Sequence, residues 1–301
     1  MFFQLLRNWL LSPGKALVGT TLFATSSWAL VLGRGGHTVV AGIFFLLLIF
    51  TLSTRLYFTT HPFLDWLLFI AAVSLSLYTP LIVWLVFLAF VIYMLNIRQK
   101  QRTVPLKTWH KLIVGSLGTL LVIPLLISFI LDKSYVLTLL GVDGLVISIP
   151  TLVLNAGSIV ASIFFINTTT SPIGLGRLPL LDIFSLFMFL LGTYYFERRL
   201  SLKRSKLLFG GLAMGIIICS LSEFNVMRVS LLLPLVYIFI SAGIHESISR
   251  WLAVFPRNPI ARTVGIIVIS IALGFTSFYH LSRTFIARPG NPQTRSLYTV
   301  K

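Results

Sequence analysis

Apolar runs of membrane-spanning length alternate with short polar segments along most of the chain. A spanning helix needs about 20 mostly apolar residues, and fewer where the bilayer is locally thinner. Runs bounded by charges or by Pro and Gly predict nine spanning helices, at Ala16–Leu32, Thr38–Ser53, Pro62–Leu77, Pro80–Asn96, Lys111–Leu131, Pro179–Phe196, Lys206–Leu221, Val229–Ser247 and Ala261–Phe278. We therefore expect an all-α fold, a polytopic integral membrane helix bundle that forms one domain over residues 1–301. Tyr78-Thr79-Pro80 predicts a tight turn between two antiparallel helices.

Basic residues concentrate in three segments between the predicted spans, which are Ile97–His110, Glu197–Ser205 and Ile248–Ile260. Lys and Arg in short loops mark the cytoplasmic side, so these segments and the amino terminus should be cytoplasmic. This orientation is consistent only if Thr151–Ile166 does not span the membrane. We expect an interfacial helix there, within an outer loop region over 132–178. The same count places an outer carboxyl tail at 279–301.

Composition agrees with a membrane protein. Hydrophobic residues make up 57% of the chain and charged residues 10%, whereas soluble domains carry about 25% charged residues. The mean hydropathy is +0.97. A net charge of +17 would suggest nucleic acid in a soluble chain, but here the cations fall between apolar runs and report topology. We expect membrane lipid as a partner and no nucleic acid.

Sites for metals and nucleotide cofactors are not expected. Cys219 is the only cysteine, so neither a disulfide framework nor a thiolate metal site can form. The histidines are dispersed and are assigned to both sides of the membrane, whereas a metal site needs clustered ligands. Walker and dinucleotide-binding loops are not found, and Gly174-Leu-Gly176 is too short to indicate one. We therefore expect no metal and no cofactor.

The stretch Ser171–Gly192 sets a charged, glycine- and proline-rich segment against an apolar run. It predicts a loop that leads into a membrane helix, with Pro179 in the first turn. Asp182 should also lie in that first turn, where a carboxylate meets the positive end of the helix dipole. Arg177 is within reach, so we expect a structural ion pair between Arg177 and Asp182. The pair can anchor a helix end, or it can belong to a ligand site.

Three arginines on the predicted outer face are candidates for binding a lipid phosphate. They are Arg34, Arg177 and Arg228. Glycines on both sides of Arg34 allow the backbone to approach a ligand closely, and a guanidinium fork can donate two hydrogen bonds to phosphate. The alternative is that Arg34 and Arg228 snorkel from helix ends to lipid headgroups.

Few carboxylates on the outer face are available for proton-transfer catalysis. The outer acids are Asp132, Asp143, Asp182 and Glu223. None is paired with a second acid in sequence, and a helix-capping or loop role accounts for each of them. The catalytic residues are therefore unknown from the sequence.

Four segments, taken in order, resemble the GT-C membrane glycosyltransferases, and more narrowly the bacterial relatives of protein O-mannosyltransferases and aminoarabinose transferases. The segments are Ala24–Arg34, Ser76–Pro80, Leu175–Asp182 and Phe255–Arg262. The resemblance implies an enzyme of a bacterial plasma membrane that takes a sugar from a polyprenyl-phosphate carrier and transfers it to an acceptor on the outer face. A polyprenyl-phosphate-linked sugar is thus the suspected ligand.

The departure from this family concerns the catalytic acid. In the family that acid lies in the first outer loop, within a short acidic motif. The first outer loop here is Gly33–His37, which has no acid, so no catalytic residue is carried over. We expect the carboxyl-terminal part of such an enzyme, with a possible partner chain that supplies the missing amino-terminal part. The alternatives are a non-catalytic scaffold or partner subunit and, with less support, a transporter, for which no inverted repeat is identified.

Overall fold

The computed structural model describes residues 1–10, 12–36, 38–57, 60–95, 106–142, 148–166, 177–222 and 224–295. Over these ranges the chain is all-helical, with 84% helix and no strand. This confirms the predicted all-α class and a helical membrane bundle.

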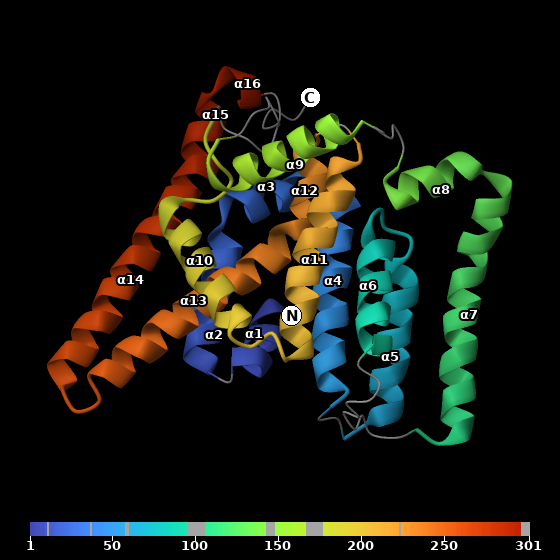
Figure 1. Cartoon of the computed structure of the whole chain (residues 1–301), viewed down its shortest axis with the longest axis horizontal. Helices are drawn as coiled ribbons and strands as arrows, with labels where there is room; N and C mark the ends of the chain where they lie inside the picture. The colour runs from blue at the N-terminus through green and yellow to red at the C-terminus, as the bar shows by residue number, and fades with distance from the viewer. Residues whose placement is uncertain are drawn as a thin grey trace.

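The helices follow one another with short connections (Figure 1). In chain order they are α1 (Phe2–Leu10), α2 (Pro13–Thr25), α3 (Ser27–Gly35), α4 (Thr38–Arg55), α5 (Pro62–Ser76), α6 (Ile82–Leu95), α7 (Thr108–Leu131), α8 (Lys133–Leu140), α9 (Ile149–Phe164), α10 (Ile183–Glu197), α11 (Lys203–Ser220), α12 (Val226–Val229), the 3₁₀ turn η1 (Ser230–Leu232), α13 (Leu233–Val254), α14 (Pro259–Ser282), the π-helical turn η2 (Arg283–Ala287), α15 (Arg288–Gly290) and α16 (Pro292–Arg295).

Each predicted apolar run corresponds to a helix, but the first one is broken. Ser26 separates α2 from α3, and the two helices are bent by 55°. The Ser26 side chain caps α3 by accepting a hydrogen bond from the amide of Ala29 at 3.2 Å. The sequence analysis missed α1 and α8. α1 is short and places its apolar side chains in the protein core, where five of its nine residues are buried.

The predicted turn between α5 and α6 is present, and residues in and beside it form hydrogen bonds to α7 and α8. Leu81 has a φ of 68°, a left-handed conformation that is uncommon for a branched residue. Its amide donates to the carbonyl of Leu139 in α8 at 2.9 Å. The indole of Trp84 donates to the carbonyl of Leu140 at 2.9 Å, and the Tyr78 hydroxyl donates to the carbonyl of Leu121 in α7 at 2.7 Å. The turn therefore docks both α7 and α8.

By length and composition, four helical segments of the described chain can cross a membrane. They are Thr38–Arg55, Thr108–Leu131, Val226–Val254 and Pro259–Gly290, and α2 with α3 makes a fifth if the bent pair is one span. α5, α6 and α10 are shorter apolar helices, and a helix of 15 residues is only about 22 Å long. α11 carries three cations in its first turn. The count of nine spans therefore stays a prediction.

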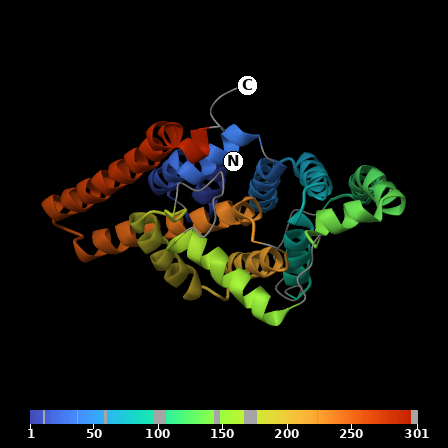
Figure 2. The ribbon, with the colours of Figure 1, turned by 90° about the horizontal axis from the view of Figure 1, so that it is seen from above.

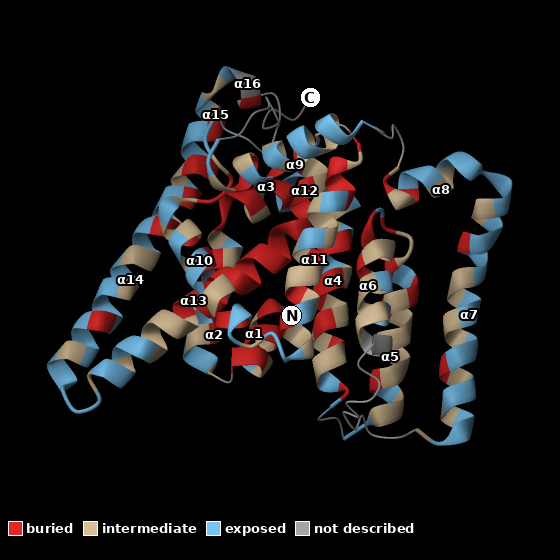
Figure 3. Cartoon of the chain, viewed as in Figure 1, coloured by how far each residue is buried: buried red, intermediate tan, exposed pale blue. Residues whose placement is uncertain are grey.

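α13 forms the centre of the molecule, and α10 packs along it (Figure 3). The contact depends on two glycines, Gly192 of α10 and Gly243 of α13, and each of them faces the backbone of the other helix. A Cβ atom on Gly192 would lie 1.8 Å from the carbonyl oxygen of Phe239, and one on Gly243 would lie 1.8 Å from that of Met188. Close backbone approach of this kind is how membrane helices associate when hydrophobicity gives no preference between protein and lipid.

The basic connections between helices gather at one end of the bundle. The connection between α10 and α11, the connection between α13 and α14, and the start of α7 lie at one end, which we name the basic end (Figure 1). Residues 97–105 of the first basic segment lie outside the described residues. At the other end α9 runs across the bundle, as Figure 2 also shows, and we name this the α9 end.

The segment expected as a carboxyl tail is helical as far as Arg295. α14 runs past Tyr279 to Ser282, and η2, α15 and α16 follow it. Arg283, Thr284 and Arg288 are buried. Residues 279–295 are therefore packed helix, and these two arginines belong to the α9 end.

Candidate functional site

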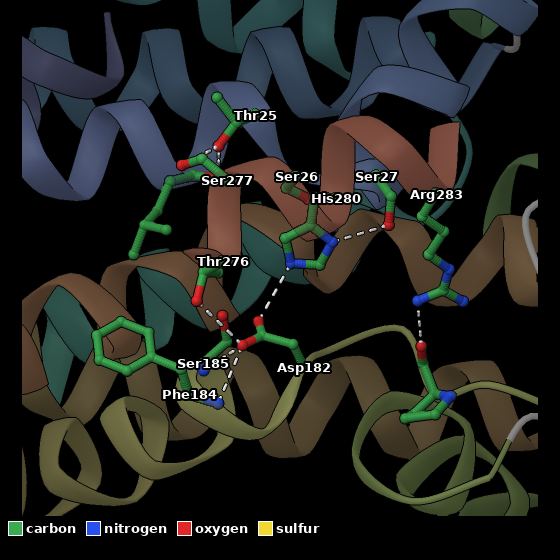
Figure 4. A network of polar contacts seen from close by, with 12 residues as sticks. Thr25, Ser26, Ser27, Asp182, Phe184, Ser185, Thr276, Ser277, His280 and Arg283 are labelled. Carbon is green, nitrogen blue, oxygen red and sulfur yellow. Dashed lines mark hydrogen bonds and ion pairs between the residues drawn. The ribbon is translucent and has the colours of Figure 1, made fainter. Parts of the chain in front are cut away.

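Asp182 is the N-cap of α10 and the centre of a polar network at the α9 end (Figure 4). Its Oδ2 accepts hydrogen bonds from the amides of Phe184 at 2.9 Å and Ser185 at 3.3 Å, which is the expected geometry of an aspartate cap. The Thr276 hydroxyl also reaches Oδ2, at 3.4 Å. The expected place of Asp182 was close but not exact: α10 begins at Ile183, so Asp182 lies just before the first turn rather than in it, and Pro179, expected in that turn, precedes the helix.

The basic side chain that contacts the carboxylate of Asp182 from another helix is His280 rather than Arg177. Nε2 of His280 lies 3.1 Å from Oδ1 of Asp182, whereas Arg177 is exposed and is not among the ion pairs of the described ranges. The expected Arg177–Asp182 pair is thus replaced by a contact between α10 and α14. Residues 98 positions apart make this contact, so local spacing gave no sign of it.

His280 also contacts Ser27 at the start of α3. The Ser27 hydroxyl lies 3.1 Å from Nδ1 of His280, so α3, α14 and α10 are joined by one chain of polar contacts. Serine, histidine and aspartate in a row suggest a nucleophile and its base. Ser27 is only 2% exposed and His280 only 1%, so a substrate has no access to the hydroxyl. The chain of contacts therefore holds helices together.

The network lowers the pKa of Asp182. Burial acts to raise this pKa, but the hydrogen bond from His280, the bonds from Ser185 and the positive charge of His280 outweigh burial. The carboxylate form is thus the one that the network stabilises.

Arg283 fixes the segment that precedes α10. Its guanidinium donates to the carbonyl of Pro179 at 2.7 Å and to that of Leu178 at 3.3 Å. The amides of Leu180 and Leu181 donate to carbonyls in α9, each at 3.0 Å. Residues 178–182 are therefore tied to α9 on one side and to α14 on the other. The sequence analysis assigned Arg283 to a tail, and the apolar period of α14 was the signal that could have extended the helix to it.

A cavity of about 210 Å³ also lies at the α9 end, and its lining shares no residue with this network. Helices α4, α8 and α12 and the turn between α5 and α6 contribute its lining, which is Thr38, Val39, Gly42, Thr79, Pro80, Leu81, Thr138, Gly141, Met227, Arg228 and Leu231. Three threonines and one arginine supply polar groups to an otherwise apolar wall. A few polar groups in an apolar cavity are typical of a ligand site.

Arg228 is held in place by contacts on both sides of the cavity. Its guanidinium donates to the carbonyl of Gly141 at 3.3 Å and to the Ser222 hydroxyl. The Asn155 amide in α9 donates to the carbonyls of Ser220 at 3.1 Å and Ser222 at 3.0 Å. The arginine is half-buried, and α9, α11 and α8 together fix its position.

The three phosphate candidates do not share one site. Arg228 lines the cavity, whereas Arg34 in the last turn of α3 and Arg177 before α10 are exposed and are not part of its lining. Sequence alone could not separate them, because the cavity is built from helix ends that are distant along the chain.

Two of the four acids predicted to be on the outer face can be described, and both have structural partners. Asp132 caps α8 by accepting from the amide and hydroxyl of Ser134, at 2.8 and 2.7 Å, and Asp182 caps α10. Asp143 and Glu223 lie outside the described residues. Among the residues that the structure describes, no group of three or more His, Cys, Asp or Glu could hold a metal ion.

Neither family models, nor curated proteins, nor solved structures give a match to this chain. The site must therefore be interpreted from its own geometry.

Proposed function

We propose that the protein binds the phosphate of a polyprenyl-phosphate lipid in the cavity lined by Arg228, as a GT-C-like membrane glycosyltransferase or the carboxyl-terminal part of one. The observation that carries the proposal is a half-buried arginine, fixed by Ser222 and Gly141, on the wall of a cavity at the end opposite the basic connections. An arginine fork binds phosphate through directed, charge-assisted hydrogen bonds.

The size of the cavity suits a headgroup rather than a whole lipid. Pockets that enclose drug-sized molecules are about 300–1,000 Å³, and this one is smaller, at about 210 Å³. A phosphate with the adjoining part of a sugar would lie beside Arg228, where the hydroxyls of Thr38, Thr79 and Thr138 are near. The isoprenoid chain would remain in the bilayer along the apolar helices.

The arrangement of the two ends of the bundle supports one orientation in the membrane. The basic end would face the cytoplasm, and the α9 end would face the outer side of a bacterial plasma membrane, with nine spans and a cytoplasmic amino terminus. Both described basic connections occur at one end, which supports this arrangement. α9 would lie along the outer interface, since its exposed side chains include Ile149, Val153 and Leu154.

Transfer of the sugar would need a base, and the described acids of the α9 end are not available for this role. General acid–base help is worth about 10²–10⁴-fold, yet Asp132 and Asp182 are occupied as helix caps. The carboxylate would then come from a partner chain. The alternative is that the protein is a non-catalytic subunit that holds the lipid. An assay with polyprenyl-phosphate sugar and a hydroxyl acceptor separates the two when the partner is added.

Binding tests the proposal directly. The full chain in lipid nanodiscs would be titrated with a long-chain polyprenyl phosphate. We expect Arg228→Ala to weaken binding about tenfold or more, which corresponds to about 1.5–3 kcal/mol for a lost charged hydrogen bond. Arg34→Ala is the matched control, because it removes an exposed arginine at the same end. Equal affinities of the two variants would contradict the proposed site.

A further inference from the structure

A second group of cationic side chains lies at the basic end, where α2, α10 and α13 pack together. The last turn of α10 and the residues after it supply Tyr194, Tyr195, Arg198 and Arg199, α13 supplies Arg250, and α2 supplies Lys15. We name these six residues the arginine–tyrosine cluster. They are unrelated to the cavity of Arg228, which lies at the other end of the bundle.

Two guanidinium groups of the cluster meet on one aromatic ring. The Cζ atoms of Arg198 and Arg250 lie 4.5 and 5.1 Å from the centroid of the Tyr194 ring. The ring attracts each cation through its quadrupole, but two like charges held this close repel each other. Glu246 accepts from Nε of Arg250 at 2.7 Å, and Arg250 is still largely exposed at 52%.

The third arginine faces the second tyrosine. Cζ of Arg199 lies 3.9 Å from the centroid of the Tyr195 ring, and its guanidinium donates to the Tyr195 carbonyl at 3.0 Å. The Tyr195 ring in turn lies 5.6 Å from the ring of His245, whose Nδ1 is buried and has no hydrogen-bond partner within the described chain. Lys15 donates to the Ser249 hydroxyl at 2.5 Å. Aromatic rings and neutral groups thus surround most of these cations.

Positive charge exceeds negative charge in this group. Four cations stand against two carboxylates, since Glu197 precedes Arg198 and Glu246 pairs with Arg250. Basic pockets between membrane helices are suited to the headgroups of anionic lipids. An anion placed between the guanidinium forks would also relieve their mutual repulsion.

The surface of α10 leads from this cluster into the apolar part of the bundle. Phe187, Leu191 and Tyr194 follow one another at spacings of four and three residues, and Arg198 continues the same stripe. Phe187 is 60% exposed, and Leu191 is 39% exposed. The order along the helix is apolar, then aromatic, then cationic, which matches the order of acyl chain, interface and phosphate in a phospholipid.

We propose that the arginine–tyrosine cluster binds the phosphate headgroup of an anionic phospholipid, whose acyl chains lie along the Phe187–Tyr194 stripe of α10. The site concerns the leaflet at the basic end and does not depend on sugar transfer or on the Arg228 cavity.

The test uses the full chain in detergent and native mass spectrometry with phosphatidylglycerol and, as a neutral lipid, phosphatidylcholine. The cluster variant is Arg199→Gln with Arg250→Gln. The control is Arg257→Gln with Arg262→Gln, which removes the same charge from two exposed arginines at the same end. We expect binding of phosphatidylglycerol to fall about tenfold or more in the cluster variant and less than twofold in the control, while phosphatidylcholine binding is unchanged.

Two further arms keep the outcome decisive. Arg199→Lys with Arg250→Lys retains the charge and removes the forks, so it should lose only part of the affinity. Equal loss in the cluster and control variants would overturn the proposal, because the binding would then reflect net charge alone. Displacement of the lipid by inorganic phosphate at equal concentration would overturn the lipid assignment and leave a general phosphate site. A thermal unfolding midpoint equal to wild type establishes that the cluster variant is folded.

Discussion

α13 and α7 are of similar length and both are long and apolar enough to span a membrane, yet they occupy opposite places in the molecule. The most apolar window of the α13 segment is 89% buried, whereas that of α7 is 11% buried. α7 is the more apolar of the two and lies at the edge of the bundle (Figures 1 and 2). Hydropathy thus predicts that a helix enters the membrane and not where it lies among its neighbours, because lipid tails are as apolar as leucine.

What distinguishes the two helices is the way they use small and polar residues. Gly243 and Ser241 of α13 face other helices, and the Ser241 side chain lies against Gly19 of α2. In α7, Gly118 faces Ile70 of α5, but Gly115 faces open space and Thr119 is exposed. Close packing, rather than apolar character, therefore selects the central helix.

The largest effect should come from filling the glycine contact of the central helix. Gly243→Leu places a side chain where the Met188 carbonyl lies 1.8 Å from the new Cβ, so α10 and α13 must separate. We expect a loss of about 3 kcal/mol in the free energy of unfolding. Gly115→Leu in α7 meets no neighbour and should be neutral or slightly stabilising. Reversible unfolding in mixed micelles measures both, and similar losses would show that the comparison of α13 with α7 is wrong.

A smaller effect is expected from the polar network at the α9 end. His280→Ala removes the partners of Asp182 and Ser27 and leaves a buried carboxylate with fewer hydrogen bonds. The free energy of unfolding should fall by about 2 kcal/mol. His110→Ala is the peripheral counterpart, since the His110 ring in α7 lies tilted against Phe63 with the ring centroids 4.5 Å apart, and should cost less than about 1 kcal/mol. If the two substitutions cost the same, the network contributes no special stability.

The smallest expected effect is on the stability of the protein at acidic pH. The pKa of Asp182 is lowered in the folded protein, so its contribution to stability is present above its unfolded pKa of about 3.9 and is lost as the pH falls through the folded value. Asp182→Asn should therefore show a weaker decline of the unfolding midpoint between pH 6 and pH 3 than wild type. The hydrogen bonds of Ser134 also lower the pKa of Asp132, but that carboxylate is exposed and water screens it. Asp132→Asn should leave the decline unchanged, and an equal change in both variants would contradict this assignment.

Much of the fold could be predicted because apolar length and cation position are local properties of a membrane sequence. The ten expected helices, the turn at Tyr78-Thr79-Pro80 and the capping position of Asp182 all follow from such local signals. α1 was missed because it is too short to span, and its apolar side chains are used in the core instead.

The site could not be predicted to the same degree, since its contacts join distant segments. Arg177 is near Asp182 in sequence, but His280 reaches it from α14. Arg228 differs from Arg34 and Arg177 because it lines a cavity, and helix ends from four parts of the chain enclose that cavity. Arg283 was assigned to a tail because a basic sequence at the end of a chain is typical of a tail, whereas here it binds the segment before α10.

The π-helical turn at Arg283–Ala287 has a consequence for length variation in this helix. In an α-helix each residue advances the side-chain direction by about 100°, so deleting one residue between Pro259 and Ser282 would turn one side of the Asp182 contact away from the other. A π turn already holds one residue more than an α turn needs. A single deletion within 285–287 would be absorbed by closing that turn, and His280 and Arg283 would keep their directions. At this turn the helix can lose one residue without rotating the side chains of α14 away from the Asp182 network.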